Sequence, residues 1–98
     1  MDEVLTRAFS LLGALMGENA ISLTSAKSGL TVLALNDELN QRVHAEFPAL
    51  LDSTRIFTKK AVRHPDQGTI SNWDITIAVN ENGQVTEKAM PVLISTNP

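Results

Sequence analysis

Apolar side chains near the N-terminus recur with the period of an α-helix. They follow the spacing i, i+3, i+7 and i+10, and two further residues widen the same side: Leu5, Ala8, Leu12 and Leu15, with Phe9 and Met16. A period near 3.6 residues predicts a helix with one buried stripe. We expect this helix to span residues 3–17, with Asp2 capping its first turn and Gly17 closing its last turn.

Apolar and polar residues alternate strictly in the C-terminal half. This alternation predicts a strand that buries four large side chains on one face: Trp73, Ile75, Ile77 and Val79. The Asn82-Gly83 pair that follows predicts a hairpin turn, for which two loop lengths fit. A two-residue loop places Val79 opposite Thr86, whereas a three-residue loop places it opposite Val85. Because cross-strand apolar pairs stabilise a sheet, we favour the three-residue loop with a glycine bulge.

Shorter runs of Ile, Leu, Val and Thr predict the other strands. Two such runs flank a polar loop and predict a first hairpin over residues 20–35. Residues 54–58 begin the remaining strands, which we place over residues 54–95, with a turn over residues 59–68. Pro91 fits the first position of a short final strand or a sheet edge, because proline has no N–H to donate.

Residues 36–53 fit two interpretations. In one, Asn36 or Asp37 caps a short helix that Pro48 ends at about Glu46. Such a helix would carry Leu39, Val43 and Phe47 on one side. In the other, the segment is a long loop, a feature that is often functional or mobile in compact domains. We slightly favour the loop, with a helical turn inside it.

Length and composition are those of one domain spanning residues 1–98, with a formal net charge of -3. The absence of cysteine excludes disulfides, thiol nucleophiles and cysteine-ligated zinc. No apolar run approaches the roughly 18 residues that span a membrane, so we expect no membrane partner. The acidic N-terminus, Met-Asp-Glu, is unlike a secretory signal and predicts a cytoplasmic protein.

The sequence contains no convincing catalytic constellation. His44 and His64 fit no recognised metal spacing, and each lies near a carboxylate in a polar context. Lys27-Ser28 lacks the glycines with which a phosphate-binding loop cradles its ligand. No Gly-x-Ser-x-Gly elbow is present. We therefore expect neither an enzyme nor a bound cofactor or metal.

Charge is distributed unevenly along the chain. Residues 1–53 carry a net charge of -4, and residues 54–98 carry +1. A basic cluster lies in the second half: Arg55, Lys59, Lys60, Arg63 and His64. This cluster fits either a solvated edge strand guarded by lysines or a surface for an acidic protein. Nucleic acid binding as the main role is disfavoured, since no aromatic residues interleave with the basic ones to stack bases. The asymmetry also suits head-to-tail contacts between identical subunits.

Two stretches are similar to a known family. Leu15-Met16-Gly17-Glu18-Asn19-Ala20-Ile21-Ser22-Leu23-Thr24, followed by Lys27-Ser28-Gly29 and Leu35-Asn36-Asp37, resembles the helix end, hairpin and loop entry of lambda-like phage head-tail joining (head completion or connector) proteins. Thr54-Arg55-Ile56-Phe57-Thr58 and the later Trp73-Asp74-Ile75 resemble that family's strand-turn-strand section. The sequence departs from the family at Gly68-Thr69, where a Gly-Asp pair is usual.

The resemblance implies an α+β fold with an N-terminal helix packed on a small antiparallel β-sandwich or barrel of about five to six strands. It implies a non-enzymatic phage or prophage structural protein that forms a homo-oligomeric ring and joins portal to tail proteins, first in the host cytoplasm and then in the virion. Residues 36–53 would be the mobile loop that orders on assembly. The residues that we expect at protein contacts are Asp37, Glu38, Arg42, His44, Phe47, Arg55, Lys59, Lys60 and Arg63. The alternative is a small α+β binding module, such as a dimeric regulator or an immunity-type inhibitor.

Overall fold

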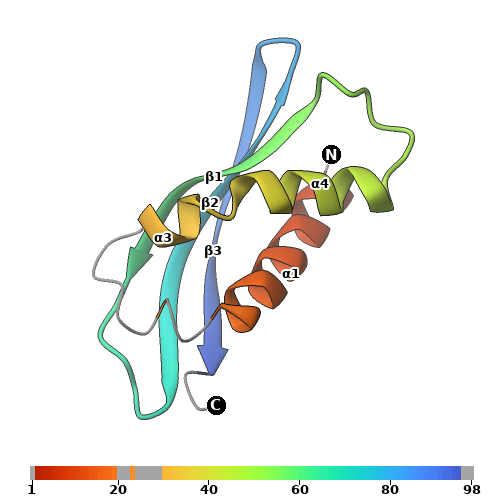
Figure 1. Cartoon of the computed structure of the whole chain (residues 1–98). Coiled ribbons are helices and arrows are strands. Elements are labelled where there is room, and N and C mark those ends of the chain that lie inside the picture. Colours follow the sequence, from red (N-terminus) through yellow and green to blue (C-terminus); the bar gives the residue numbers. More distant parts are fainter. Residues whose placement is uncertain (1, 20–22, 24–29, 96–98) are drawn as a thin grey trace.

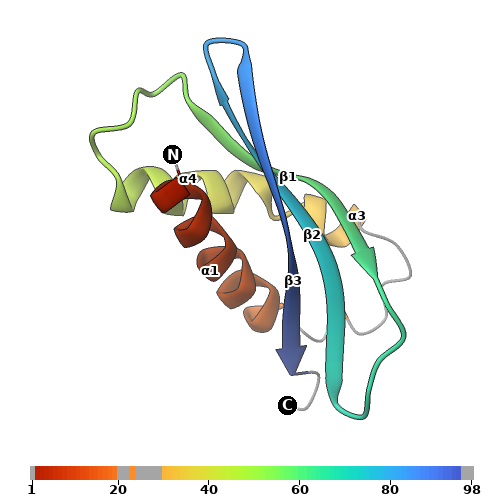
Figure 2. The ribbon, with the colours of Figure 1, turned by 180° about the vertical axis from the view of Figure 1, so that it is seen from behind.

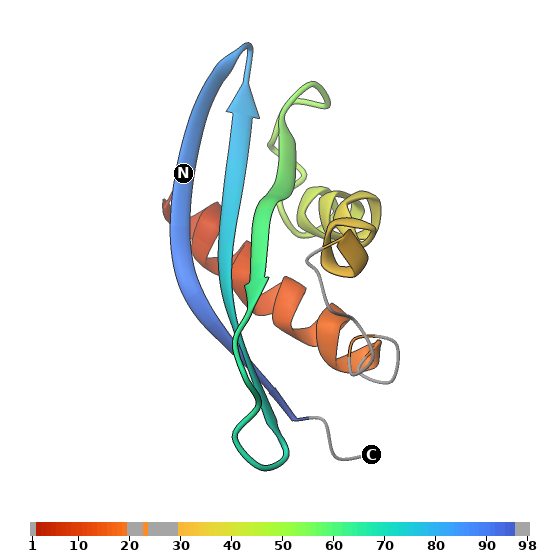
Figure 3. The ribbon, with the colours of Figure 1, turned by 90° about the vertical axis from the view of Figure 1, so that its left-hand side faces the viewer.

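The structure is a computed structural model that describes residues 2–19, 23 and 30–95, and its fold is α+β (Figure 1). Among the described residues, three helices precede three strands: α1 (Asp2–Glu18), α3 (Leu30–Leu33), α4 (Asn36–Glu46), β1 (Arg55–Arg63), β2 (Ile70–Glu81) and β3 (Gln84–Ser95). The strands form one antiparallel sheet in the order β1-β2-β3. The helices lie on one side of this sheet (Figure 3).

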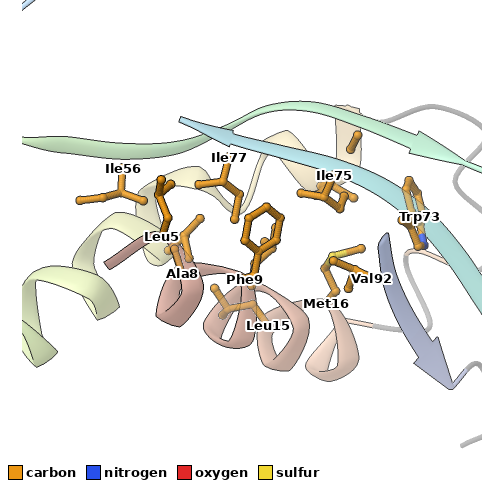
Figure 4. Close-up of a cluster of buried hydrophobic side chains, with 14 of the residues drawn as sticks. Leu5, Ala8, Phe9, Leu15, Met16, Ile56, Trp73, Ile75, Ile77 and Val92 are labelled. Atoms are coloured by element: carbon orange, nitrogen blue, oxygen red, sulfur yellow. The ribbon is translucent and has the colours of Figure 1, made fainter. Parts of the chain in front are cut away.

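The core forms where α1 crosses the sheet (Figure 4). The predicted helix is confirmed, and every residue of its apolar stripe is buried. It continues through Gly17 to Glu18, so this glycine does not close the helix as predicted. The predicted strand is also confirmed, because its four large side chains on β2 are at most 1% exposed: Trp73, Ile75, Ile77 and Val79. Val92 on β3 completes this contact, since the backbone of Gly13 on α1 comes close to its side chain.

Residues 36–46 form helix α4, so the long loop that we favoured over 36–53 is wrong for its first two thirds. The helical alternative is confirmed, and the helix ends at Glu46 as Pro48 requires. Its N-cap is Leu35, however, so the predicted capping by Asn36 or Asp37 is wrong. Leu39 and Val43 are fully buried, which explains why the segment folds onto the body of the protein. Tertiary burial outweighs the polar composition of this segment.

The predicted sandwich or barrel of five to six strands is replaced by a single open sheet of three long strands in the described part of the chain. Residues 20–22 and 24–29 of the predicted first hairpin lie outside the described residues, but residues 30–33 form helix α3 and not a strand. Val32 of α3 is fully buried among the helices and the sheet. The β-branched Val32 therefore fills the core without pairing in a sheet.

The turn between β2 and β3 has two residues, not the three that we favoured. Asn82 and Gly83 have φ of 52° and 87°, and Val79 pairs with Thr86. Positive φ at both central positions gives a type I′ turn, whose twist matches that of the flanking strands. Asn80 Oδ1 also accepts a hydrogen bond from Gly83 N at 2.9 Å. The geometry of the turn therefore determines the register of the hairpin and outweighs the pairing of Val79 with Val85 that we expected.

β1 and β3 are the two edges of the sheet (Figure 2). β1 continues through the predicted turn at residues 59–68 as far as Arg63, with a register shift between Thr58 and Lys60. β3 runs without a break past Pro91, so the proline lies within an edge strand, as the second of its two predicted placements required.

Candidate interaction surfaces

Helix α4 caps the outer edge of β1 with one row of side chains. Ile56 N donates to Asn40 Oδ1 at 2.8 Å. Asn36 exchanges two hydrogen bonds with the backbone of Thr58, and His44 Nε2 donates to Thr54 O at 2.6 Å. Four helical residues rise about 6 Å and two strand residues about 6.6 Å, so an i, i+4, i+8 row matches alternate residues of a strand.

His44, which we expected at a protein contact, therefore belongs to this internal cap. Its ring is partly buried, and its hydrogen bond lies within the chain. A capped edge offers no free backbone groups to another strand. The β1 edge is consequently closed by the protein's own helix over residues 54–58.

The other predicted contact residues of α4 take part in ion pairs within the chain. Arg42 contacts Glu18 at 3.1 Å and Glu38 at 3.0 Å, and Asp37 lies 3.6 Å from Arg55. The hydrogen bond that Arg42 donates to Glu18, with a second one to Glu38, raises the pKa of Arg42 above its ordinary value. All these side chains are at least one third exposed, so the pairs contribute little to stability.

Phe47 lies beside an open depression of about 570 Å³ between α1 and the end of α4. Arg7 and Glu46 meet in it through a bidentate ion pair, with Nη2 to Oε1 at 2.7 Å and Nε to Oε2 at 2.8 Å. The hydrogen bond from Arg7 lowers the pKa of Glu46. The two charges of this pair satisfy each other, whereas Glu3, which also lines the depression, has no ion pair among the described residues.

The predicted basic cluster does not form a basic surface. Four of its five members have a carboxylate partner: Arg55 with Asp37, Lys59 with Glu87, Arg63 with Asp66, and His64 with Asp74 at 2.6 Å. Lys60 is exposed and has no ion pair among the described residues. This neutralisation favours neither of the two roles that depend on positive charge, an acidic partner or nucleic acid.

Arg63 is the most buried member of the cluster, with its side chain 14% exposed. Its guanidinium donates to Leu23 O at 2.7 Å and to Asp66 Oδ2 at 2.8 Å. It also lies 5.7 Å from the centre of the Trp73 ring. These contacts tie the β1–β2 loop and the segment after α1 to the sheet, which is a structural task.

Within the described part of the chain, no group of three or more His, Asp or Glu side chains is placed to hold a metal ion. None of the helices described is long and apolar enough to cross a membrane.

The face of the sheet opposite the helices is uncovered by any described element (Figure 3). We call it the outer face, and it exposes one or more large apolar side chains from every strand: Val62 (39% exposed), Ile70 (37%), Val85 (48%) and Leu93 (66%). Two cross-strand ion pairs, His64 with Asp74 and Lys59 with Glu87, lie among them. A mixed surface of exposed apolar residues and satisfied charges is typical of protein contacts.

These four residues were not predicted from the sequence. The signal was present in β3, where Leu93 lies between Val92 and Ile94, so that the strand is apolar on both faces. Only one face of a strand can meet the helices of a two-layer domain. A strand that is apolar on both sides therefore indicates a second contact.

The outer edge of β3 is open, in contrast to that of β1. His64 N donates to Asn72 O, so even-numbered residues of β2 bond to β1 and odd-numbered residues bond to β3. Because Trp73 pairs with Val92, even-numbered residues of β3 bond to β2. The N–H and C=O groups of odd-numbered β3 residues therefore point away from β2, toward the open edge. No described residue bonds to those groups between Val85 and Leu93.

Comparison with protein-family models, curated proteins and solved structures finds no significant match for this chain.

Proposed function

We propose that this chain is a non-enzymatic assembly protein that binds another protein through the outer face of its sheet. The exposure of Val62, Ile70, Val85 and Leu93 on one uncovered face carries the proposal. Burying apolar surface contributes about 25 cal/mol per Å², so a partner that covers these side chains gains most of its binding free energy there. The paired charges around them need not be separated on binding.

The resemblance to head-tail joining proteins supports one setting for this role, in which the partner is a phage portal or tail protein. The structure does not support one feature of that family, the mobile loop that we expected over residues 36–53. Helix α4 is folded, and its Leu39 and Val43 are fully buried, so most of residues 36–53 does not await a partner in order to fold. The contact is therefore better assigned to the sheet than to that segment.

The test is native mass spectrometry of the chain mixed with any portal and tail proteins that are encoded beside its gene. We expect a stoichiometric complex with the wild type and loss of that complex in the double variant Val62→Lys/Ile70→Lys. The lysine introduced at position 62 would face Asp74 across the sheet, so the fold should tolerate it.

Ala14→Lys, at an exposed position of α1, is the matched control and should bind as the wild type does. Equal binding by the double variant would overturn the outer face as the contact. A stoichiometric complex with a toxin encoded nearby, and none with portal or tail proteins, would replace the head-tail setting with the immunity-type alternative.

A further inference from the structure

We propose that two copies of this chain pair along the open edges of β3, antiparallel and centred on Ala89, so that two three-stranded sheets become one six-stranded sheet. This contact uses backbone groups at the edge of the sheet. The contact also covers Val85 and Leu93, which belong to the outer face, but it does not involve Val62 and Ile70, so the two proposals are tested at different residues.

The two edges of the sheet differ in their backbone hydrogen bonding. The edge of β1 is satisfied by Asn36, Asn40 and His44, whereas the edge of β3 presents a row of backbone groups between Val85 and Leu93 with no partner among the described residues. A long open edge is a template for another strand. A second β3 matches it in length and direction when the two strands run antiparallel.

The outer edges of the six-stranded sheet also favour pairing between two copies. When β3 pairs with β3 of a second copy, both outer edges of the six-stranded sheet are β1 strands, and each is capped by its own α4. Pairing through β3 therefore leaves only β1 strands at the outer edges, each closed by α4 over residues 54–58, which favours a dimer over continued growth of the sheet. An unrelated strand at the same edge would close it only if that strand brought a cap of its own.

Charges and prolines along β3 restrict the register of the β3–β3 pairing. Residues opposite each other in an antiparallel pair point to the same face of the sheet, and neighbouring residues of one strand point to opposite faces. The two-fold axis that relates the two copies must therefore pass through one residue of β3, because an axis between two residues would pair side chains of opposite faces. Centring on Glu87 or Lys88 would set like charges opposite each other, and centring on Pro91 would set two prolines at the axis. Centring on Met90 would leave Val85 opposite Ser95.

Centring on Ala89 avoids these conflicts. It sets Val85 opposite Leu93 of the partner subunit, twice, and so covers the two most exposed apolar side chains of the sheet. It also sets Lys88 beside Met90 of the partner subunit on the helix side, where Met90 is 38% exposed. The small side chain of Ala89 fits the crowded position at the axis.

Proline limits the pairing without preventing it. Pro91 would face Glu87 of the partner subunit, where one donor is missing in each copy. The five outward-facing residues of each strand could form ten interstrand hydrogen bonds, and the two prolines reduce this number to roughly eight. This number of bonds, with two Val–Leu pairs, is enough for a specific contact.

Sedimentation equilibrium on the wild type and three variants tests the proposal. The wild type should have twice the chain mass of 10.6 kDa at high concentration. Val85→Lys and Leu93→Glu should each raise the dimer dissociation constant about tenfold, because each substitution acts at two symmetric positions. The double variant should recover the wild-type constant or better, since the lysine introduced at position 85 then faces the glutamate introduced at position 93 of the second copy.

Within one chain, positions 85 and 93 are eight residues apart on the same strand and cannot form that pair. Rescue by the double variant is therefore specific to the centred register. A wild type that stays monomeric at about 1 mM, or a double variant that fails to recover, overturns the proposal. Neither result affects the portal and tail test, whose variants lie on β1 and β2.

A cysteine cross-link provides a second measurement, because the chain has no cysteine of its own. Residues that exchange hydrogen bonds across an antiparallel pair have Cα atoms about 5.5 Å apart, within the range of a disulfide. Ala89→Cys should form a disulfide-linked dimer under mild oxidation. Ala45→Cys, exposed on α4, should not exceed the collisional background. Equal cross-linking at both positions would contradict the register.

Discussion

Asn36 and Thr58 exchange two hydrogen bonds, one in each direction. Asn36 Nδ2 donates to Thr58 O at 3.1 Å, and Thr58 N donates to Asn36 Oδ1 at 2.7 Å. The side-chain amide thus takes the place of the peptide group that a neighbouring strand would offer. This relationship explains how a helix ends a sheet at β1.

Removing that amide should destabilise the fold. Asn36→Ala leaves the N–H and C=O of Thr58 without partners in a partly buried site, and we expect a loss of about 1 to 2 kcal/mol in the free energy of unfolding. Urea unfolding followed by the emission of Trp73, the chain's one tryptophan, measures this change. Gln41→Ala, exposed on the same helix, should change stability by less than about 0.5 kcal/mol. Equal effects of the two variants would show that the cap contributes nothing specific.

Arg63 should contribute more than its neighbour Lys60, although both are basic residues of β1. Arg63→Met keeps the apolar stem but removes the donors to Leu23 O, Asp66 and the buried Ser71 hydroxyl, at a cost of about 2 to 3 kcal/mol. Lys60→Met should stay within about 0.5 kcal/mol of the wild type. The two urea midpoints provide the comparison, and a neutral Arg63→Met would assign these contacts no energetic role.

One substitution should have opposite effects at two glycines. Gly83→Ala forces a side chain to adopt φ of 87°, and we expect a loss of about 1 kcal/mol. Gly17→Ala lies in the last turn of α1, where a Cβ meets nothing within 4 Å, and should stabilise the helix by about 0.5 kcal/mol. Thermal unfolding of both variants checks the signs. Destabilisation at both positions would contradict the helical conformation of Gly17.

The Arg7–Glu46 ion pair should make stability depend on pH on the acid side. Arg7 lowers the folded-state pKa of Glu46, so the pair stabilises the fold above the ordinary glutamate pKa. That contribution is lost as the pH falls through the lowered pKa. Glu46→Gln should therefore be less stable than the wild type at neutral pH and equal to it in acid.

Both side chains of the pair are well exposed, so this difference should be small and should shrink in high salt. Urea midpoints across the acid range measure it. Glu81→Gln, exposed at the β2–β3 hairpin, is the control and should follow the wild type at every pH. A difference that grew in acid would reverse the sign of the pKa shift.

Elements with a strong period could be predicted from the sequence. The stripe of α1 and the alternation of β2 each place their apolar residues on one face, and both faces are buried. Residues 36–46 gave a weaker signal, because only Leu39 and Val43 anchor that helix fully. The type I′ turn was predicted with one residue too many, because the Val79–Val85 pairing was given more weight than the twist of the turn.

The nine predicted contact residues were chosen for charge and position, and eight of them have partners or packing within the chain. Asn36, Asn40 and His44 have a spacing that is visible in the sequence, but a row of polar residues on a helix acquires a role only when a strand edge lies against it. The exposed outer face was hidden for the same reason, since a sequence shows that β3 is apolar on both sides but not which side the helices cover.

The sequence by itself determined the first helix, the central strand, the hairpin site and the absence of cysteine chemistry, because each depends on neighbours along the chain. Tertiary structure alone decided that helices cover one face of the sheet, that α4 closes the β1 edge, and that the β3 edge stays open among the described residues. The physical reason is that hydrogen bonds and ion pairs join whichever groups the fold brings together. Asn36 meets Thr58 across 22 residues of chain, and no local pattern records that meeting.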